Sequence, residues 1–253
     1  ALSPSAEMAA VLEPRAGLLR VEEAVQALQH AARAHGAVLR HGEEALGWTA
    51  GGAGVVVSAA GGDYHAGHVV LSAGPWLPRL VGELGLPLWV ERQLSHWFEP
   101  AGDPAELSSA RCPVTLWEHA PGRVFYTIPD PGGHGFKAGL HHEGERVDPD
   151  TVDRTPRPGD EARVRALLAR FVPRANGRLL DARVCLYTNT PDEHFLIDRH
   201  PGHERVLLAS PCSGHGFKFA TAIGEALAGL VAEGRARFDL SPFALSRLRH
   251  GSG

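Results

Sequence analysis

The stretch VLLASPCSGHGFKFATAIGEAL, residues 206–227, indicates the fold class, because a strand, a glycine loop and a helix follow one another in it. Val206–Ser210 is a short apolar run of the kind that forms a buried strand. The helix that follows has four apolar residues on one face: Phe219, Ile223, Leu227 and Leu230. Free backbone N–H groups at a helix start attract electron-rich ligand atoms, and the loop glycines Gly214 and Gly216 allow a flat or anionic ligand to approach closely. The stretch therefore predicts a strand–loop–helix unit with a ligand site at the loop, and a plain tight turn is the alternative.

Within this stretch the pentapeptide GHGFK, residues 214–218, repeats an earlier copy at residues 133–137. Lys137 and Lys218 are the only lysines among the 25 Lys+Arg residues. Lys218 falls in the first turn of the predicted helix, where a cation opposes the helix dipole. A residue in an unfavourable place suggests a functional role, and a solvated surface lysine is the alternative.

The first copy of the pentapeptide continues as GFKAGLHH, which reads as a strand. Strand alternation places three of its residues on one face: Lys137, Gly139 and His141. Val124–Ile128 is a second strand candidate, and pairing with the first would bring Tyr126 within reach. A Lys/His/Tyr set suits the binding of a carboxylate or the stabilisation of charge that develops during a reaction. Three unrelated polar residues on a half-exposed sheet remain the alternative.

Composition favours small-molecule chemistry. The chain has 253 residues, 43% of them hydrophobic and 21% charged, which fits one large domain or two interleaved ones. Its net charge is −4 and it has no basic run, so we expect neither nucleic-acid binding nor a polybasic membrane segment. Its apolar runs are far shorter than a membrane span, and its first residues do not resemble a signal peptide.

The cysteines and the remaining elements complete this outline. Three dispersed cysteines, Cys112, Cys185 and Cys212, are too few for a disulfide framework, so we expect a cytoplasmic protein. VEEAVQALQHAARAHGA predicts an amphipathic helix that begins at Val21 and ends before Gly36. Glycine-punctuated strands follow, and the region from about Glu91 to Thr190 predicts a mostly antiparallel sheet with one helix around GDEARVRALLARFV.

Residues Cys185–Leu230, CLYTNTPDEHFLIDRHPGHERVLLASPCSGHGFKFATAIGEALAGL, resemble the carboxyl-terminal signature of the monomeric sarcosine oxidase family. These flavoprotein amine oxidases include N-methyltryptophan oxidase and belong to the D-amino-acid-oxidase-like superfamily. The resemblance covers essentially the whole chain, and its further segments are KAGLHHEGERVDPDTVDR, LPLWVERQLSHWFEP, VLSAGPWLPRLVGELG and LEPRAGLLRVEEAVQAL.

The resemblance implies a mixed α/β fold of two interleaved domains. Residues 1–20 and 91–190 would form the substrate domain, a mostly antiparallel mixed sheet, and residues 21–90 and 191–253 would form an incomplete FAD-binding domain. The family begins with a strand and a GxGxxG dinucleotide loop, which is absent here. The GGAG at Gly51–Gly54 lies in a hairpin context. We therefore expect that about the first third of a family member is missing and that the chain alone binds FAD weakly.

The resemblance also assigns roles to individual residues. Cys185 corresponds to the cysteine that attaches FAD covalently through a thioether. Lys137 corresponds to the basic residue that promotes electron transfer to dioxygen, and Lys218 to the lysine that holds the substrate carboxylate. His141 and Tyr126 correspond to other substrate-site residues. Two further segments correspond to flavin-facing positions, namely Gly214, His215, Gly216 and Phe217, and Ser72, Ala73, Gly74 and Trp76.

The implied activity is the oxidation of a secondary amine, such as the N-methyl amino acid sarcosine, with dioxygen as acceptor, by a monomeric enzyme. The products would be an imine that hydrolyses to an aldehyde, and hydrogen peroxide. One alternative is a non-catalytic remnant or subunit that holds no FAD by itself. Another, a metallohydrolase, is suggested by 15 histidines, with His134, His141 and His142 close together. Strand alternation predicts that the rings of His141 and His142 lie on opposite faces, and no HExxH is present, so we expect no metal site.

Overall fold

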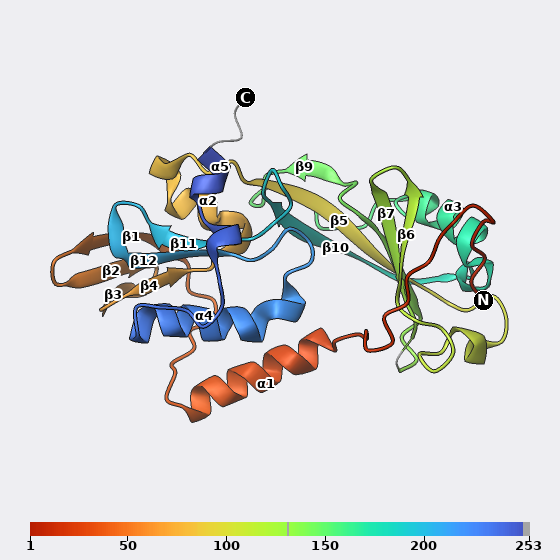
Figure 1. Ribbon diagram of the computed structural model, residues 1–253, viewed down its shortest axis with the longest axis horizontal. Coiled ribbons are helices and arrows are strands. Elements are labelled where there is room, and N and C mark those ends of the chain that lie inside the picture. The colour runs from red at the N-terminus through yellow and green to blue at the C-terminus, as the bar shows by residue number, and fades with distance from the viewer. Residues whose placement is uncertain (131, 250–253) are drawn as a thin grey trace. The chain divides into compact units, whose positions relative to one another are not determined.

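The computed structural model describes residues 1–130 and 132–249, and the chain divides into two compact units (Figure 1). Unit 1 comprises Ala1–Leu19 and Glu91–Leu186, and unit 2 comprises Arg20–Val90 and Tyr187–Gly253. Residues 250–253, which end the expected FAD-binding domain, lie outside the described residues.

Unit 1 is built on a six-stranded sheet of order β10-β5-β8-β7-β6, with β9 paired to β5. The strands are β5 (Trp89–Phe98), β6 (Thr115–Ala120), β7 (Arg123–Ile128), β8 (Phe136–His141), β9 (Glu145–Val147) and β10 (Leu179–Asn189). The helices are η3 (Pro104–Leu107), α3 (Ala162–Phe171) and η4 (Pro173–Ala175), where η denotes a 3-10 helix. The pairs β5·β8, β7·β8 and β6·β7 are antiparallel, which confirms the sheet predicted for this part of the chain.

Alternation along β8 separates the core of unit 1 from its opposite face. Phe136 and Ala138 are fully buried, and they belong to a core cluster that includes Leu168 and Phe171 of α3. Lys137, which lies between them, and Gly139, which follows Ala138, are on the other face, as the sequence predicts. This second face of the sheet therefore carries polar side chains on a rigid support.

Unit 2 contains two three-stranded sheets, β1-β2-β3 and β11-β12-β4. Their strands are β1 (Ala45–Gly51), β2 (Gly54–Ala59), β3 (Gly62–Ala66), β4 (Val69–Leu71), β11 (Leu196–His200) and β12 (His203–Ser210). The helices are α1 (Val21–Ala34), η1 (Gly74–Trp76), α2 (Leu77–Leu80), η2 (Gly82–Leu84), η5 (Phe217–Phe219), α4 (Ala220–Ala232), η6 (Ser241–Phe243) and α5 (Ser246–Arg249). The GGAG segment joins β1 to β2 in antiparallel register, which confirms its hairpin context.

Helix α1 is present where the sequence predicts it, and Gly36 follows its end with φ +88°. Its apolar face is not covered, because Val21, Val25 and Leu28 are 43%, 37% and 45% exposed. Amphipathic spacing therefore identified the helix correctly, although no residue of α1 is buried.

The helix after the GHGFK loop begins differently from the prediction. Residues Phe217–Phe219 form the 3-10 helix η5, and the α-helix α4 begins only at Ala220. Lys218 therefore lies before the α-helix, and its Nζ donates a hydrogen bond to the His215 carbonyl oxygen at 2.9 Å. Lys218 was expected in the first turn of the α-helix, opposed to its dipole; instead the 3-10 turn presents a carbonyl group to it.

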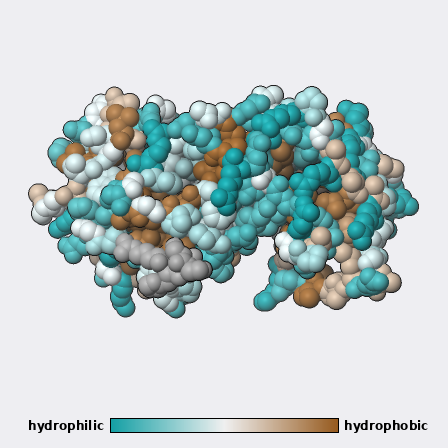
Figure 2. Space-filling model, turned by 90° about the horizontal axis from the view of Figure 1, so that it is seen from above, coloured by the Kyte–Doolittle hydropathy of each residue, from teal (hydrophilic) through white to brown (hydrophobic). Residues whose placement is uncertain are grey.

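Hydrophilic residues predominate on the face shown in Figure 2, and the hydrophobic residues form smaller, separate patches. Among residues 1–130 and 132–249, every helix is too short or too polar to cross a membrane.

Candidate functional site

In unit 1, Lys137 lies in an aromatic environment on the polar face of the sheet. The strand register places it opposite Trp97 of β5 and Ile128 of β7. Its Nζ lies 5.0 Å from the ring centroid of Trp97 and 6.0 Å from that of Tyr126. Both distances are within cation–π range, so the two rings stabilise a charged ammonium at this position. Lys137 and Tyr126, which the sequence placed on separate strands, are thus brought together.

The phenol of Tyr126 occupies space that a glycine leaves open. Tyr126 of β7 pairs with Gly139 of β8, and a Cβ atom at Gly139 would lie 2.5 Å from the phenol oxygen. The phenol oxygen lies 3.0 Å from the Ser95 Oγ. Burial raises the pKa of Tyr126 to about 12, and the hydrogen bond to Ser95 opposes this shift. At neutral pH, Tyr126 is therefore a protonated phenol that can donate a hydrogen bond.

Cys185 lies on β10, is half-buried, and is not part of a disulfide. Burial raises the pKa of its thiol, while the Lys137 ammonium and a hydrogen bond from Ser95 act in the opposite direction. The thiolate is the reactive form of cysteine, and a nearby cation favours it. The predicted flavin-attachment residue thus lies in the same cluster as Lys137 and Tyr126.

His141 ends β8 on the face that carries Lys137, where it pairs with Val124 of β7. The prediction that the His141 and His142 rings lie on opposite faces was wrong, since their centroids are 4.1 Å apart. The reason is that His142 leaves the strand with φ +56°, so strand alternation stops at His141. Across residues 1–130 and 132–249, no group of three or more His, Cys, Asp or Glu residues could hold a metal ion.

In unit 2, two loops leave the same edge of a sheet. Strands β4 and β12 are parallel, with Leu71 paired to Leu208, so their carboxyl ends lie at one edge. Ser72–Trp76 follows β4, and Pro211–Phe217 follows β12. In open α/β sheets, ligands bind outside the carboxyl ends of parallel strands. The structure therefore brings the two predicted flavin-facing segments to one edge of the sheet. The first contains Ser72, Ala73, Gly74 and Trp76, and the second is the glycine loop after β12.

The loop after β12 requires glycine at two positions. Gly214 has φ +74°, and a Cβ atom there would lie 2.3 Å from the ring of Tyr187. A Cβ atom at Gly216 would lie 1.6 Å from the Pro211 carbonyl oxygen. Ser213 anchors the loop, because its backbone N–H donates to Thr188 O at 2.9 Å and its hydroxyl to a neighbouring carbonyl group. The loop is therefore tightly folded, with bare backbone at its glycines.

The other predicted residues of this loop have mostly local partners. His215 donates from its Nε2 to the Glu193 carbonyl oxygen at 2.9 Å, and its ring lies 5.0 Å from that of Phe195. Phe217 is 37% exposed at the start of η5. Lys218 and these residues belong to unit 2, whereas Lys137, Tyr126 and Cys185 form the cluster of unit 1, and His141 lies in the same unit at the end of β8.

The sequence interpretation did not include three members of the unit 1 cluster. They are Ser95, Trp97 and Arg183. Ser95 contacts Tyr126, and the Trp97 ring makes cation–π contacts with Lys137 and with the Arg183 guanidinium, whose Cζ is 5.4 Å from the ring centroid. Alternation along RQLSHWFEP would have placed Ser95 and Trp97 on one face. Only strand order, however, puts β5 next to β8, so the sequence could not show that this face is the one that carries Lys137.

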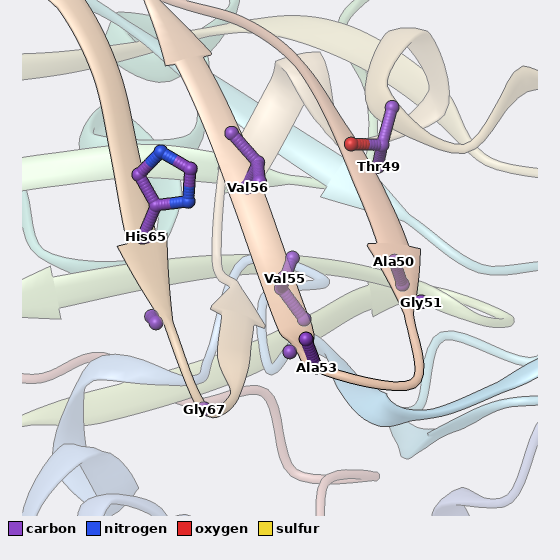
Figure 3. A pocket seen from close by; sticks show the side chains of 10 residues that line it. Thr49, Ala50, Gly51, Ala53, Val55, Val56, His65 and Gly67 are labelled. Atoms are coloured by element: carbon purple, nitrogen blue, oxygen red, sulfur yellow. The ribbon is translucent and has the colours of Figure 1, made fainter.

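A hollow of about 520 Å³ lies at the β1-β2-β3 hairpins (Figure 3). Small or apolar residues such as Ala53 and Val55 line it, together with Thr49 and His65. None of the predicted site residues is among its lining residues. The predicted site residues lie instead in the unit 1 cluster and, separately, in the unit 2 loops.

The family described as FAD dependent oxidoreductase (DAO) matches residues 1–230. Monomeric sarcosine oxidase from Bacillus sp. (strain NS-129) is 40% identical over 243 residues, which is 94% of this chain and 62% of that protein. N-methyl-L-tryptophan oxidase from Salmonella heidelberg (strain SL476) is 36% identical over 197 residues, 77% of this chain and 51% of that protein.

The solved structure of L-proline dehydrogenase from P. horikoshii has a similar fold, with a TM-score of 0.76 and 22% identity. The match covers 91% of this chain and 60% of the dehydrogenase. At this identity the likeness concerns the fold alone, and it confirms the mixed α/β class expected from the sequence. The chain spans 62% of the length of the Bacillus sarcosine oxidase.

Proposed function

The chain belongs to the FAD-dependent oxidoreductase family, and from this premise we propose that it serves the oxidation of a secondary amine. The proposed substrate is an N-methyl amino acid such as sarcosine, dioxygen is the acceptor, and the products are an imine that hydrolyses to an aldehyde, and hydrogen peroxide. The observation that carries the proposal is the grouping of Lys137, Tyr126 and Cys185 on one sheet face. The 40% identity to monomeric sarcosine oxidase supports this substrate class.

The residues of each unit, taken separately, suit the binding of FAD. In unit 2, Gly214 and Gly216 let the loop fold tightly at the carboxyl edge of the β4·β12 pair, because a side chain at either position would collide with the loop's own surroundings. In unit 1, Cys185 is a free thiol beside a cation. When bound, FAD supplies a two-electron acceptor for the amine. We propose that it is attached covalently through the Cys185 sulfur.

The chain's own residues have separate roles in this proposal. The Lys137 ammonium, fixed by Trp97 and Tyr126, stabilises negative charge that develops on dioxygen. Lys218 pairs with the substrate carboxylate, and its exposure in η5 leaves it accessible. Tyr126 and His141 line the substrate side of the sheet face. Unit 1 would then be the substrate domain and unit 2 the FAD-binding part.

We further propose that residues 1–253 alone bind FAD weakly and that the protein acts as a monomer in the cytoplasm. Within these residues no GxGxxG loop is available to hold the phosphates of FAD. The free cysteines Cys112, Cys185 and Cys212 support a reducing compartment.

Peroxide release tests the proposed activity. The chain is assayed with FAD and a panel of sarcosine, N-methyltryptophan and proline, alone and together with the part of the Bacillus relative that it does not cover. We expect peroxide from sarcosine, and more of it in the second case. After acid precipitation, yellow flavin should remain in the pellet of wild type but not of Cys185→Ser. Absence of peroxide with every amine, under conditions in which flavin is bound, would reject the proposal.

A further inference from the structure

We propose that the ion pair of Asp192 and Arg247 positions the glycine loop, residues 211–216, by fixing the turn of residues 190–194 against which that loop is held. The inference rests on the proposed function in so far as the loop is a ligand site. Its geometric part concerns only residues of unit 2. Asp192 and Arg247 are positioning residues in this scheme, since they act on a ligand only through the loop.

The Asp192 carboxylate accepts hydrogen bonds from several groups at the turn. Arg247 binds it with both arms of its guanidinium fork, because Nε donates to Oδ2 at 2.6 Å and Nη2 donates to Oδ1 at 3.1 Å. The Thr190 Oγ1 lies 2.8 Å from Oδ1, and the His194 backbone N–H donates to the same oxygen at 3.3 Å. The Arg247 guanidinium, with help from Thr190, holds the pKa of Asp192 well below its usual range. Asp192 is therefore a charged carboxylate at neutral pH.

The turn presents two carbonyl groups to the glycine loop. The buried Ser213 hydroxyl donates to the His194 carbonyl oxygen at 2.9 Å. The His215 ring donates from its Nε2 to the Glu193 carbonyl oxygen, also at 2.9 Å. The carbonyl oxygen of His215 in turn accepts a hydrogen bond from the Lys218 Nζ at 2.9 Å. The position of the turn therefore sets the position of the loop and of the lysine that follows it.

Arg247 connects this turn to the hydrophobic core through α5. Leu245, just before the helix, and Leu248, within it, belong to the core cluster of unit 2 and are 5% and 9% exposed. The Leu245 backbone N–H also donates to the Asp198 Oδ2 of β11 at 2.7 Å. Because α5 is anchored and a bidentate pair is directional, Arg247 holds Asp192 in one orientation.

The backbone on both sides of the contact has an uncommon conformation. Among residues 1–130 and 132–249, Glu193 and Ser213 are two of the three non-glycine residues with positive φ, at +56° and +44°. Such conformations persist only where surrounding contacts enforce them. The turn and its ion pair supply those contacts, so loss of the pair should loosen the loop without unfolding the unit.

Hydrogen exchange of the loop amides tests this positioning. The Ser213 backbone N–H donates to the Thr188 carbonyl oxygen, so exchange in a peptide that covers residues 211–219 reports opening of the loop. In the 253-residue chain we expect Arg247→Gln to raise this exchange rate about twofold to fivefold, as for one partly exposed ion pair. Alkylation of the half-buried Cys212 by iodoacetamide should become faster by a similar factor.

A double-mutant cycle shows whether the two side chains act as a pair. Asp192→Asn should raise the exchange of residues 211–219 as Arg247→Gln does, and the double variant should add little to either. Arg247→Lys, which keeps the charge without the fork, should give an intermediate rate. Glu23→Gln is the matched control, because it removes an exposed pair with Arg20 at 2.8 Å in the same unit and should leave the loop unchanged.

In the active, flavin-loaded protein, the KM for sarcosine should rise in Arg247→Gln, while the oxygen reaction keeps its rate because Lys137 lies in unit 1. Four results would overturn the inference: unchanged exchange of residues 211–219 in both single variants, additive effects in the double variant, an equal rise of exchange in β1 and β2, or an unchanged KM. Exchange and alkylation need neither flavin nor amine, so they remain decisive if the proposed oxidase activity fails.

Discussion

Lys137 and Lys218 occupy identical pentapeptides, yet their side chains have different neighbours. Lys137 lies on a strand between two aromatic rings, whereas Lys218 lies in a 3-10 turn and bonds a carbonyl group three residues earlier. A compact ammonium suits both positions, because the broad guanidinium of arginine would fill more space and spread its charge. The two lysines therefore share a chemical type and not a structural role.

Substitution of the two lysines should affect different steps. In the flavin-loaded protein, we expect Lys137→Met to slow electron transfer to oxygen on the order of a hundredfold, as for the loss of one charge-stabilising group. Lys218→Met, the matched control, should instead raise the KM for the amino acid. Stopped-flow measurement of the reductive and oxidative half-reactions separates these effects. Equal rates of oxygen reaction in wild type and Lys137→Met would contradict the role given to Lys137.

The burial of His96 changes its pKa and therefore makes the stability of the fold depend on pH. His96 is 2% exposed, with its ring 6.1 Å from that of Phe98. Burial lowers its pKa, and the nearby Glu161 and Asp160 carboxylates oppose that shift. The unfolded chain therefore takes up a proton at higher pH than the folded chain. The stabilisation that depends on a neutral His96 is complete when the pH is above the His96 pKa of the unfolded chain. It is lost as the pH falls toward the lower His96 pKa of the folded chain.

We therefore expect His96→Phe to be less sensitive to acid than wild type. As the pH falls below about 6.5, the ordinary histidine pKa, the free energy of unfolding should decrease less in the variant than in wild type. Urea unfolding at a series of pH values measures this difference. A difference that stays constant between pH 7.5 and pH 5 would show that the burial of His96 does not govern acid stability.

At the scale of elements, the loop between β12 and α4 determines what a ligand at this sheet edge would contact. The parallel pair β4·β12 gives the edge, and the backbone of residues 211–216 folds so tightly that Gly214 and Gly216 have no room for a side chain. By contrast, a Cβ atom added at Gly224 of α4 would have no neighbouring atom within 4 Å. The loop glycines therefore have crowded surroundings and the helix glycine has open ones, although all of them follow β12.

Alanine substitution of these glycines should have opposite effects. We expect Gly216→Ala to destabilise unit 2 by about 1–3 kcal/mol, the usual cost of overpacking, because the new Cβ would collide with the Pro211 carbonyl oxygen. Gly224→Ala should stabilise the helix by about 0.5–1 kcal/mol. Thermal unfolding of both variants checks this pair. Similar melting temperatures for the two would argue against the tight loop.

At the scale of the whole molecule, each unit has its own hydrophobic core. The core of unit 1 contains Phe98, Phe136 and Leu168. The core of unit 2 contains Leu71, Leu196, Leu208 and further residues of the same unit. Because each core is made within one unit, we expect the two units to lose protection separately when one core is damaged.

Leucine truncation in each core tests this independence. Leu168→Ala and Leu208→Ala each remove a fully buried side chain, at a cost of about 2–5 kcal/mol. We expect Leu168→Ala to raise hydrogen exchange in Glu91–Leu186 and Leu208→Ala to raise it in unit 2, as followed by mass spectrometry. Equal loss of protection in both units, in either variant, would instead indicate one cooperative structure.

The sequence alone determined the features that depend on local periodicity. Helical spacing located α1 and α3, strand alternation separated Lys137 from Phe136 and Ala138, and the strand–loop–helix pattern located the glycine loop. Such patterns are local because backbone geometry repeats every 2 or about 3.6 residues. The same rule failed at His142, where a positive φ ends the alternation without a signal in the residues.

Only the tertiary structure decided which distant residues share a site. Strand order brings Ser95 of β5, Tyr126 of β7 and Cys185 of β10 around Lys137 of β8. It also places Ser72–Trp76 and the glycine loop at one sheet edge. The physical reason is that strand pairing is a long-range contact, chosen by the packing of whole faces and not by the residues of one strand.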